Sequence, residues 1–171
     1  MDRKERADKI QLQIFYGCSI FLILLDQATK HWAQLSFRGQ PTQTYLGDLF
    51  RFDYAENPGA FLGMGDSLSS PSRFWIFTIL VFLMMLGLIF FLHFRKFSRS
   101  EAWAYSLVFA GGIGNLIDRA FRTEGRVIDF MNMGVGSLRT GIFNVADMAI
   151  LAGLILLVFF GKKESSSKST P

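Results

Sequence analysis

Long apolar blocks alternate with polar stretches along this chain. Phe74 to His93 runs for 20 residues without a formal charge, and Ile142 to Phe160 runs for 19 residues with two polar interruptions. Ala102 to Ile117 is shorter and rich in glycine, and Leu12 to Leu25 gains length if its helix continues to Trp32, an aromatic residue suited to a membrane interface. A helix needs about 20 residues to cross the hydrocarbon core. The pattern therefore predicts an all-α membrane protein with four spans, at about residues 12–32, 74–93, 102–118 and 142–160.

The polar stretches between these blocks predict a small β-sheet outside the membrane. Residues 33–72 form the first outer loop, and apolar and polar positions alternate from Thr44 to Asn57, which predicts one or two short strands followed by a turn at NPGA. Residues 119–141 form the second outer loop, where glycines mark turns around a short central segment. We expect a short helix or loop within these outer parts. The tail, residues 162–171, is expected to be disordered.

Charge distribution predicts the orientation in the membrane. The chain is 50% hydrophobic with a net charge of +4, and basic residues cluster before the first block, between the second and third, and in the tail. By the positive-inside rule, both termini of this single domain are then cytoplasmic. The opposite side also carries several arginines, which we expect to pair with acids or with lipid head groups. The basic start resembles a signal peptide, but no small-residue cleavage site follows, so we interpret the first block as an uncleaved span.

Polar residues gather at one end of the predicted helices. They are Asp26 and Lys30 on the first span, Asn115 and Asp118 on the third, Asn144 and Asp147 on the fourth, and Asp129 in the connecting loop. A carboxylate at the bilayer centre costs roughly 2.5 to 3.5 kcal/mol on insertion scales, so an acid such as Asp147 usually persists because it has a function. Helix rise places Asp147 roughly 7 Å inside its span. Two acids that meet at a membrane surface favour acid/base chemistry.

Structural roles explain several of these residues equally well. Asp26 and Lys30 are four residues apart, so a surface ion pair is the simplest interpretation, and Asp118 can pair with Arg122 in the same way. Asn115 could bridge helices. For Asp129 and Asp147 a structural role is less convincing, because neither has a basic partner at helical spacing within its own segment.

Other site chemistries fit the sequence poorly. His31 and His93 are predicted at opposite ends of their helices and Cys18 in the core, so we expect no metal and no cofactor. Nothing has the basic and aromatic pattern of a nucleic-acid groove. GMGD at residues 63–66 spells the GxGD motif of presenilin-like and prepilin-type aspartyl proteases. The following SLSSPSR is predicted to be a loop, whereas those proteins need this aspartate in a membrane helix, so we discount the motif.

Five motifs together resemble lipoprotein signal peptidase, also called signal peptidase II. They are DQATK, NPGA, GNLIDR, VIDF and FNVAD, in the order and spacing of that family, and they extend over nearly the whole chain. The resemblance implies a bacterial four-helix aspartyl protease with an extracytoplasmic β-cradle and a short helix near the site. It would cut the signal peptide from lipid-modified prolipoproteins before the lipidated cysteine. Phe61 departs from the family, which usually has a small residue there.

The resemblance also implies roles for individual residues. Its catalytic pair falls on Asp129 and Asp147. Its supporting polar positions fall on Asp26, Lys30, Asn57, Asn115, Asp118, Arg119 and Asn144. One carboxyl would hold a proton while the other acts as a general base toward water. We expect a monomer in the bacterial inner membrane, in contact with membrane lipids, with its active site near the extracytoplasmic surface.

Two different functions compete with this interpretation. A small transporter or channel subunit could use Asp26, Asp118 and Asp147 as an ion or proton relay. The acids cluster at one face, however, and do not form a ladder across the membrane. A non-catalytic lipid-binding or assembly protein could instead use its outer arginines to bind head groups.

Overall fold

The computed structural model describes residues 3–59 and 68–167. Helices alternate with short strands in the order α1, β1, β2, α2, η2, α3, α4, η3, β3, β4, α5. The helices are α1 (Arg3–Phe37), α2 (Ser70–Arg73), the π-helical η2 (Phe74–Leu80), α3 (Val81–Phe94), α4 (Arg99–Phe121), the 3-10 turn η3 (Thr123–Gly125) and α5 (Val145–Ser167). The strands are β1 (Gln43–Tyr45), β2 (Phe50–Asn57), β3 (Val127–Val135) and β4 (Leu138–Arg139).

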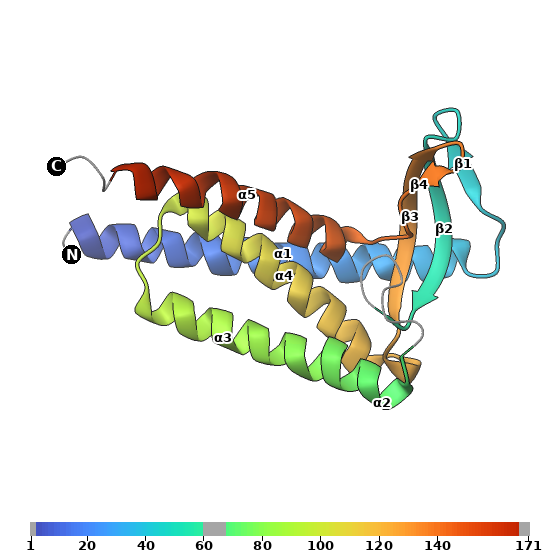
Figure 1. Ribbon diagram of the computed structural model, residues 1–171, viewed down its shortest axis with the longest axis horizontal. Coiled ribbons are helices and arrows are strands. Elements are labelled where there is room, and N and C mark those ends of the chain that lie inside the picture. Colours follow the sequence, from blue (N-terminus) through green and yellow to red (C-terminus); the bar gives the residue numbers. More distant parts are fainter. Residues whose placement is uncertain (1–2, 60–67, 168–171) are drawn as a thin grey trace.

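The four strands form one antiparallel sheet at one end of the helices (Figure 1). In the central pair, Ala55 faces Asp129 and Asn57 faces Val127, and the register shifts between Phe52 and Ala55. The predicted strands within residues 44–57 are confirmed as β1 and β2. The second outer loop contains a longer strand than expected, because β3 is nine residues long.

Helix α4 lies at the centre of the bundle and packs against both α1 and α5. It begins at a capping box, in which Ser98 and Glu101 bond to each other's backbone N–H groups. Its glycines permit close approach. A methyl group added to Gly111 would overlap the carbonyl oxygen of Ala146, and one added to Gly114 would lie 2.7 Å from Asp26 Oδ2. These two glycines therefore let α4 pack closely against α5 and α1.

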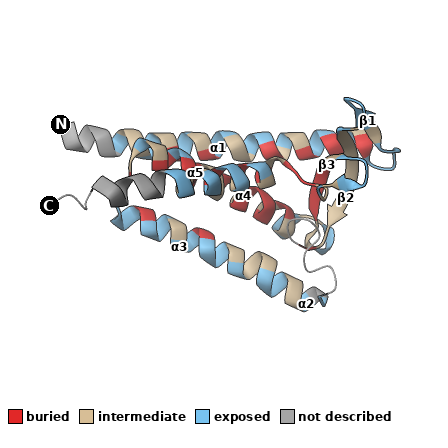
Figure 2. Ribbon diagram, turned by 45° about the horizontal axis from the view of Figure 1, so that its top comes forward, coloured by how far each residue is buried: buried red, intermediate tan, exposed pale blue. Residues whose placement is uncertain are grey.

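Apolar side chains cover the outer surface of the helices. Helix α3 buries only Met85 and Leu92, whereas Phe90 and Phe94 are 67% and 71% exposed. Figure 2 shows the buried residues concentrated where α1, α4 and α5 approach the sheet. Exposed apolar surface of this extent is typical of contact with lipid. Within the described ranges, Lys9–Phe37 and Pro71–Phe94 are long and apolar enough to cross a membrane, and Val145–Phe159 is a shorter apolar helix.

Several element boundaries differ from those expected. The second span begins at Ser70, because α2 continues directly into η2. The last residues of SLSSPSR, which were predicted to be a loop, are therefore helical. Helix α5 starts at Val145, because Phe143 forms a β-bridge with Met131 and thus belongs to the sheet. Asp147 is therefore in the first turn of α5 and not roughly 7 Å inside it. Helix α5 also continues to Ser167, so the tail is helical beyond residue 162.

Three smaller predictions concern Cys18, residues 60–66 and the two histidines. Cys18 lies in α1 and is half-buried, so the prediction that it is a core residue is wrong. Ala60, Phe61 and the GMGD motif at residues 63–66 lie outside the described residues. Both histidines are placed as predicted, His31 near the sheet end of α1 and His93 at the opposite end of the bundle on α3.

Candidate active site

Asp129 and Asp147 reach the same asparagine from two different elements. Asp129 lies in β3 and is 2% exposed, and Asp147 lies in the first turn of α5. Asn144 donates its side-chain amide to Asp129 Oδ1 at 2.6 Å and its backbone N–H to Asp147 Oδ2 at 3.1 Å. Asn144 thus binds both carboxylates, Asp129 through its side chain and Asp147 through its backbone, and keeps them close together.

The start of α5 explains why Asp147 is so well oriented. Asn144 precedes the helix, and its side-chain oxygen accepts the Asp147 backbone N–H at 2.9 Å while the Asp147 carboxylate accepts the Asn144 N–H. This reciprocal pair is a capping box, in which two otherwise unpaired backbone donors are satisfied. The Asn115 side chain donates to Asp147 Oδ1 at 2.9 Å. Both carboxylate oxygens therefore have an N–H donor.

Asp129 is held in the same symmetrical way. The Asn57 side chain donates to Asp129 Oδ2 at 2.8 Å, opposite the contact from Asn144. Asn57 is oriented by its own turn, since its side-chain oxygen accepts the Gly59 N–H at 2.9 Å. Arg119 fastens this turn from α4, donating to the Gly59 carbonyl at 2.7 Å while its guanidinium lies over the ring of Phe77.

Burial has a clear electrostatic effect on Asp129. Removal from water raises the pKa of Asp129 to about 7, and the nearby charge of Asp147 contributes to the rise, whereas the amide donors Asn57 and Asn144 oppose it. A carboxyl with a pKa near 7 can hold a proton at neutral pH, as a general acid must.

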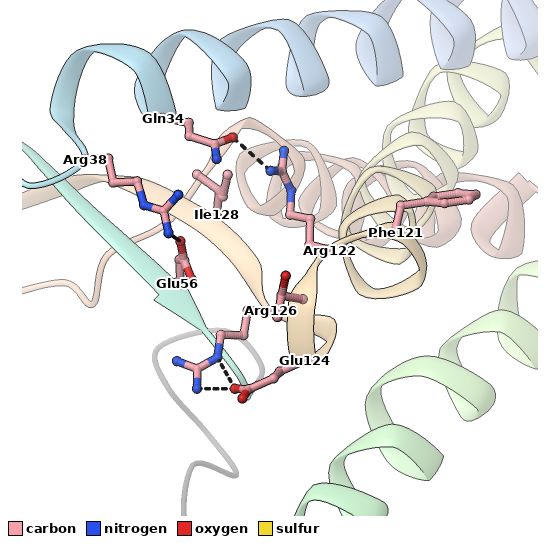
Figure 3. Close-up of a pocket in the computed structure, with 9 residues that line it drawn as sticks. Gln34, Arg38, Glu56, Phe121, Arg122, Glu124, Arg126 and Ile128 are labelled. Atoms are coloured by element: carbon pink, nitrogen blue, oxygen red, sulfur yellow. Dashed lines mark hydrogen bonds and ion pairs between the residues drawn. The ribbon is translucent and has the colours of Figure 1, made fainter.

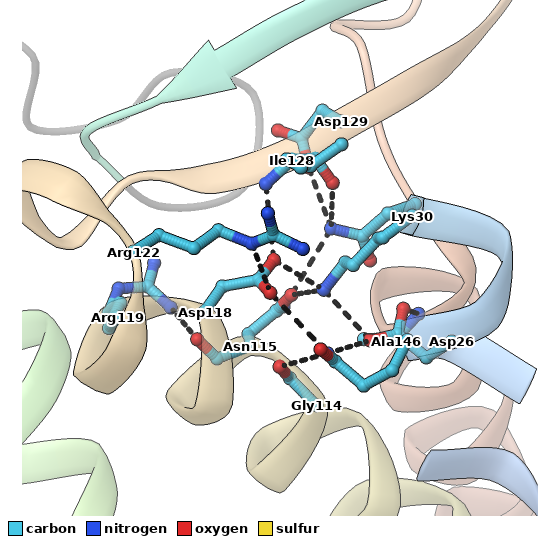
Figure 4. Close-up of polar contacts among 12 residues, drawn as sticks. Asp26, Lys30, Gly114, Asn115, Asp118, Arg119, Arg122, Ile128, Asp129 and Ala146 are labelled. Atoms are coloured by element: carbon cyan, nitrogen blue, oxygen red, sulfur yellow. Dashed lines mark hydrogen bonds and ion pairs between the residues drawn. The ribbon is translucent and has the colours of Figure 1, made fainter. Parts of the chain in front are cut away.

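A buried lysine lies near Asp129, between Asp26 and Asp118 (Figure 4). Lys30 is 0% exposed, and its ammonium group contacts Asp26 Oδ2 at 2.8 Å, Asn115 Oδ1 at 2.9 Å and Asp118 Oδ2 at 3.0 Å. An ammonium has three N–H groups, so these three acceptors use all of them. The ion pair of Asp26 and Lys30 therefore exists, but the expected surface location is wrong, because α4 and α5 enclose both side chains.

Each acid partner of Lys30 also fixes a neighbouring backbone element. Asp26 accepts the backbone N–H of Ala146 at 2.9 Å and thereby caps the start of α5. Asp118 accepts the backbone N–H of Ile128 at 3.2 Å, next to Asp129 in β3, and pairs with Arg122 at 2.8 Å. The predicted Asp118–Arg122 pair is confirmed. So is the bridging role of Asn115, which contacts residues of α1 and α5.

The structure brings all nine residues singled out in the sequence into one connected network. It also adds Gln27, which donates to Asp26 Oδ2 and the Gly114 carbonyl, both at 3.1 Å, and contacts Asp118. Gln27 lies inside the DQATK motif, but nothing in its residue type distinguished it from a surface glutamine. Within the described ranges, no group of three or more His, Cys, Asp or Glu is arranged to hold a metal ion.

An apolar groove opens beside Asp147. It has a volume of about 330 Å³ and lies between the sheet and the first turns of α5. Its other lining residues are Phe50, Met131, Met133, Thr140, Phe143, Met148 and Leu151. The side chains of Met148 and Leu151 are about half exposed on the outer surface of α5. An apolar chain in this groove would therefore lie against Asp147 and the outer surface of α5.

A bundle with an apolar outer surface and a buried carboxylate pair at one end is the architecture of a membrane enzyme that uses acid/base chemistry. Two solved structures described as bacterial membrane enzymes have the same fold, with TM-scores of 0.75 and 0.70 at 25% and 26% identity, and the first alignment extends over 91% of this chain and 92% of the other. The model of the signal peptidase II family matches residues 18–161. The chain belongs to this family.

Bacterial relatives match this chain over most of their own length. The lipoprotein signal peptidase of Syntrophomonas wolfei is 33% identical, over 88% of this chain and 96% of the relative. The lipoprotein signal peptidase of Thermodesulfovibrio yellowstonii is 37% identical, over 85% of this chain and 93% of the relative. The resemblance inferred from the five motifs is therefore confirmed.

Proposed function

We propose that this chain is an aspartyl endopeptidase that removes signal peptides from diacylglyceryl-modified lipoprotein precursors, with Asp129 and Asp147 as its catalytic pair. The observation that supports this most strongly is the shared Asn144, which donates to both carboxylates beside an apolar groove. Family membership supplies the substrate class, and the geometry supports the assignment of the pair.

The mechanism follows from which aspartate holds the proton. We assign it to Asp129, whose pKa is raised to about 7 by burial and by the charge of Asp147, because the start of a helix favours the anion on its partner. Asp147 lies in the first turn of α5, where the positive end of the helix dipole favours an anion. Of the two, Asp147 therefore acts as the base and takes a proton from the attacking water. Asp129 polarises the scissile carbonyl and then protonates the leaving amine.

The apolar groove places the substrate. With the sheet at the outer membrane surface, the groove of Phe50, Met131 and Leu151 faces the outer leaflet beside Asp147. Acyl chains on the precursor cysteine would hold the scissile bond at the depth of the carboxylates, so that the search for the bond becomes a confined encounter. Lipidated precursors are then better substrates than unlipidated ones.

The placement in the membrane follows the bundle. We propose four spans, formed by α1, α2 to α3, α4 and α5, in the bacterial inner membrane, with both termini cytoplasmic and the sheet outside. The start of α1 and the end of α5 lie together, opposite the sheet (Figure 1), as an even number of crossings requires. Single cysteines at Thr44 and Lys96, in a Cys18→Ser background, test this in spheroplasts with an impermeant thiol reagent. Labelling at position 96 but not at 44 would reverse the orientation.

The substrate assignment is tested with one precursor prepared with and without its diacylglyceryl group. Purified protein should release the signal peptide of the lipidated form, with the cut before the modified cysteine as read by mass spectrometry. The unlipidated form should have a much lower kcat/KM. Equal kcat/KM values would exclude acyl placement, and no cleavage of either form would exclude the peptidase activity and favour an ion relay.

A further inference from the structure

A second cavity lies behind the sheet, on the other side of β3 from the two aspartates. Its volume is about 460 Å³, and Figure 3 shows its walls, which come from the outer ends of α1, β2 and α4 and from the segment leading into β3. The residues that line it are Gln34, Arg38, Glu56, Phe121, Arg122, Thr123, Glu124, Arg126 and Ile128. Because neighbouring side chains of a strand face opposite sides, Ile128 forms part of this wall while Asp129 faces the active site.

The cavity combines cationic donors with anionic acceptors. Arg38 contacts Glu56 through Nη2 at 3.2 Å, Arg122 uses Nε and Nη1 for Asp118 and Gln34, and Arg126 uses Nε and Nη2 for Glu124. Each guanidinium has five N–H donors, so all three arginines keep donors beyond these contacts within the described part of the chain. The glutamates likewise keep lone pairs as acceptors.

The surroundings of the cavity indicate a ligand that is anchored in the membrane. In the proposed placement, the outer ends of α1 and α4 lie at the membrane surface. Phe121 lines the cavity and is 86% exposed, so an apolar side chain stands at its mouth. A free solute gains nothing from such a rim, whereas a lipid can place its head group inside and its acyl chains beside Phe121.

We propose that this cavity binds the head group of a phospholipid in which a phosphodiester is joined to a primary ammonium. Arginine pairs with phosphate through its planar fork of N–H groups, and the ammonium group would donate to Glu56 and Glu124. The proposed site takes no part in the peptidase reaction. The proposal rests on the membrane placement proposed above and not on the catalytic roles of the aspartates.

The site also has a route to the active site. Arg122 lines the cavity and pairs with Asp118, which contacts Lys30 and the backbone of Ile128. A bound head group would therefore stabilise the packing of α1, α4 and β3 on the side of the sheet opposite Asp129.

Native mass spectrometry of the delipidated full-length protein tests the proposal. Phosphatidylethanolamine and phosphatidylcholine with identical acyl chains are compared, because the second has the same phosphate but no N–H donor. We expect roughly tenfold more retained phosphatidylethanolamine, about the effect of one hydrogen bond to a charged group. Equal retention of the two lipids would overturn the proposal.

Variants locate the binding to this cavity. Arg38→Gln with Arg126→Gln should lower the retention of both lipids, because it removes donors to the shared phosphate. Arg51→Gln should leave the retention unchanged, because Arg51 pairs with Asp48 at the far end of the sheet. Glu124→Gln, at an exposed position, should reduce the preference without risk to folding. Unchanged retention in the double arginine variant, or an unchanged preference in Glu124→Gln, would contradict the site. Soluble glycerophosphoethanolamine is the last arm, and competition as strong as that of the lipid would show a site for a solute.

Discussion

Replacing Lys30 by methionine should destabilise this protein more than almost any other single change. The ammonium is fully buried and contacts Asp26, Asn115 and Asp118. Methionine has a similar length but no charge, so the two carboxylates lose their shared cation. Breaking a buried ion pair by removing one partner costs roughly 3 to 5 kcal/mol, because the remaining charge stays in a site of low polarity.

Asp26 and Asp118 should contribute unequally to the destabilisation of Lys30→Met. Asp118 keeps Arg122 at 2.8 Å, whereas the described contacts of Asp26 contain no cation besides Lys30. Most of the penalty therefore belongs to Asp26. Adding Asp26→Asn to Lys30→Met should recover about half of the lost stability, since asparagine can still accept the Ala146 N–H. Adding Asp118→Asn should recover little, because it leaves Arg122 without its acid partner.

The assay is thermal unfolding of the purified protein in one detergent. A change of 1 kcal/mol shifts the midpoint by about 2 to 4 °C for a chain of this size, so Lys30→Met should lower it by about 10 °C. A shift below about 2 °C would refute the claim that the lysine compensates buried charge. Equal rescue by Asp26→Asn and Asp118→Asn would refute the assignment of the penalty to Asp26.

Two further predictions test the carboxylates and the packing around them. Asn57→Ala removes a donor that favours the ionised form of Asp129, so its pKa should rise above about 7, and the loss of activity at alkaline pH should move to higher pH; an unmoved or lowered limb would contradict this. Gly111→Ala should lower the unfolding midpoint by about 5 °C, because its methyl group meets the backbone of Ala146 and overpacking costs roughly 1 to 3 kcal/mol. Gly17→Ala is the control, since nothing lies within 4 Å of a methyl group there, and equal shifts for the two variants would contradict the steric account.

The features that the sequence predicts well are those with a local cause. Apolar blocks such as Phe74 to His93 predict helices because few other arrangements satisfy backbone groups in lipid. Alternation from Thr44 to Asn57 predicts strands for a similarly local reason. The three-residue spacing of Asn144 and Asp147 indicates a shared helical face, and the structure shows the capping box that this spacing permits.

The features that the sequence left open depend on contacts between distant segments. The spacing of Asp26 and Lys30 indicates an ion pair, but only the packing of α1 against α4 decides that the pair is buried. Helix α5 begins later than its apolar run because Phe143 pairs with Met131 across the sheet. Gln27 acquires its role from Asp118, which lies 91 residues away in the sequence. Local periodicity contains no information about such contacts.

The central claim is that Asp129 and Asp147 perform the chemistry together, and their asparagine variants test it most directly. Asparagine keeps the shape of each side chain but cannot exchange the proton that the mechanism requires. The measurement is kcat for a lipidated precursor, with Asp48→Asn as the control because Asp48 pairs with Arg51 in a turn at the far end of the sheet. The account predicts that Asp129→Asn and Asp147→Asn each lower kcat by at least about a thousandfold, within the range attributed to general acid/base groups, in protein that still unfolds in a single cooperative transition. Near wild-type turnover by either variant would contradict it.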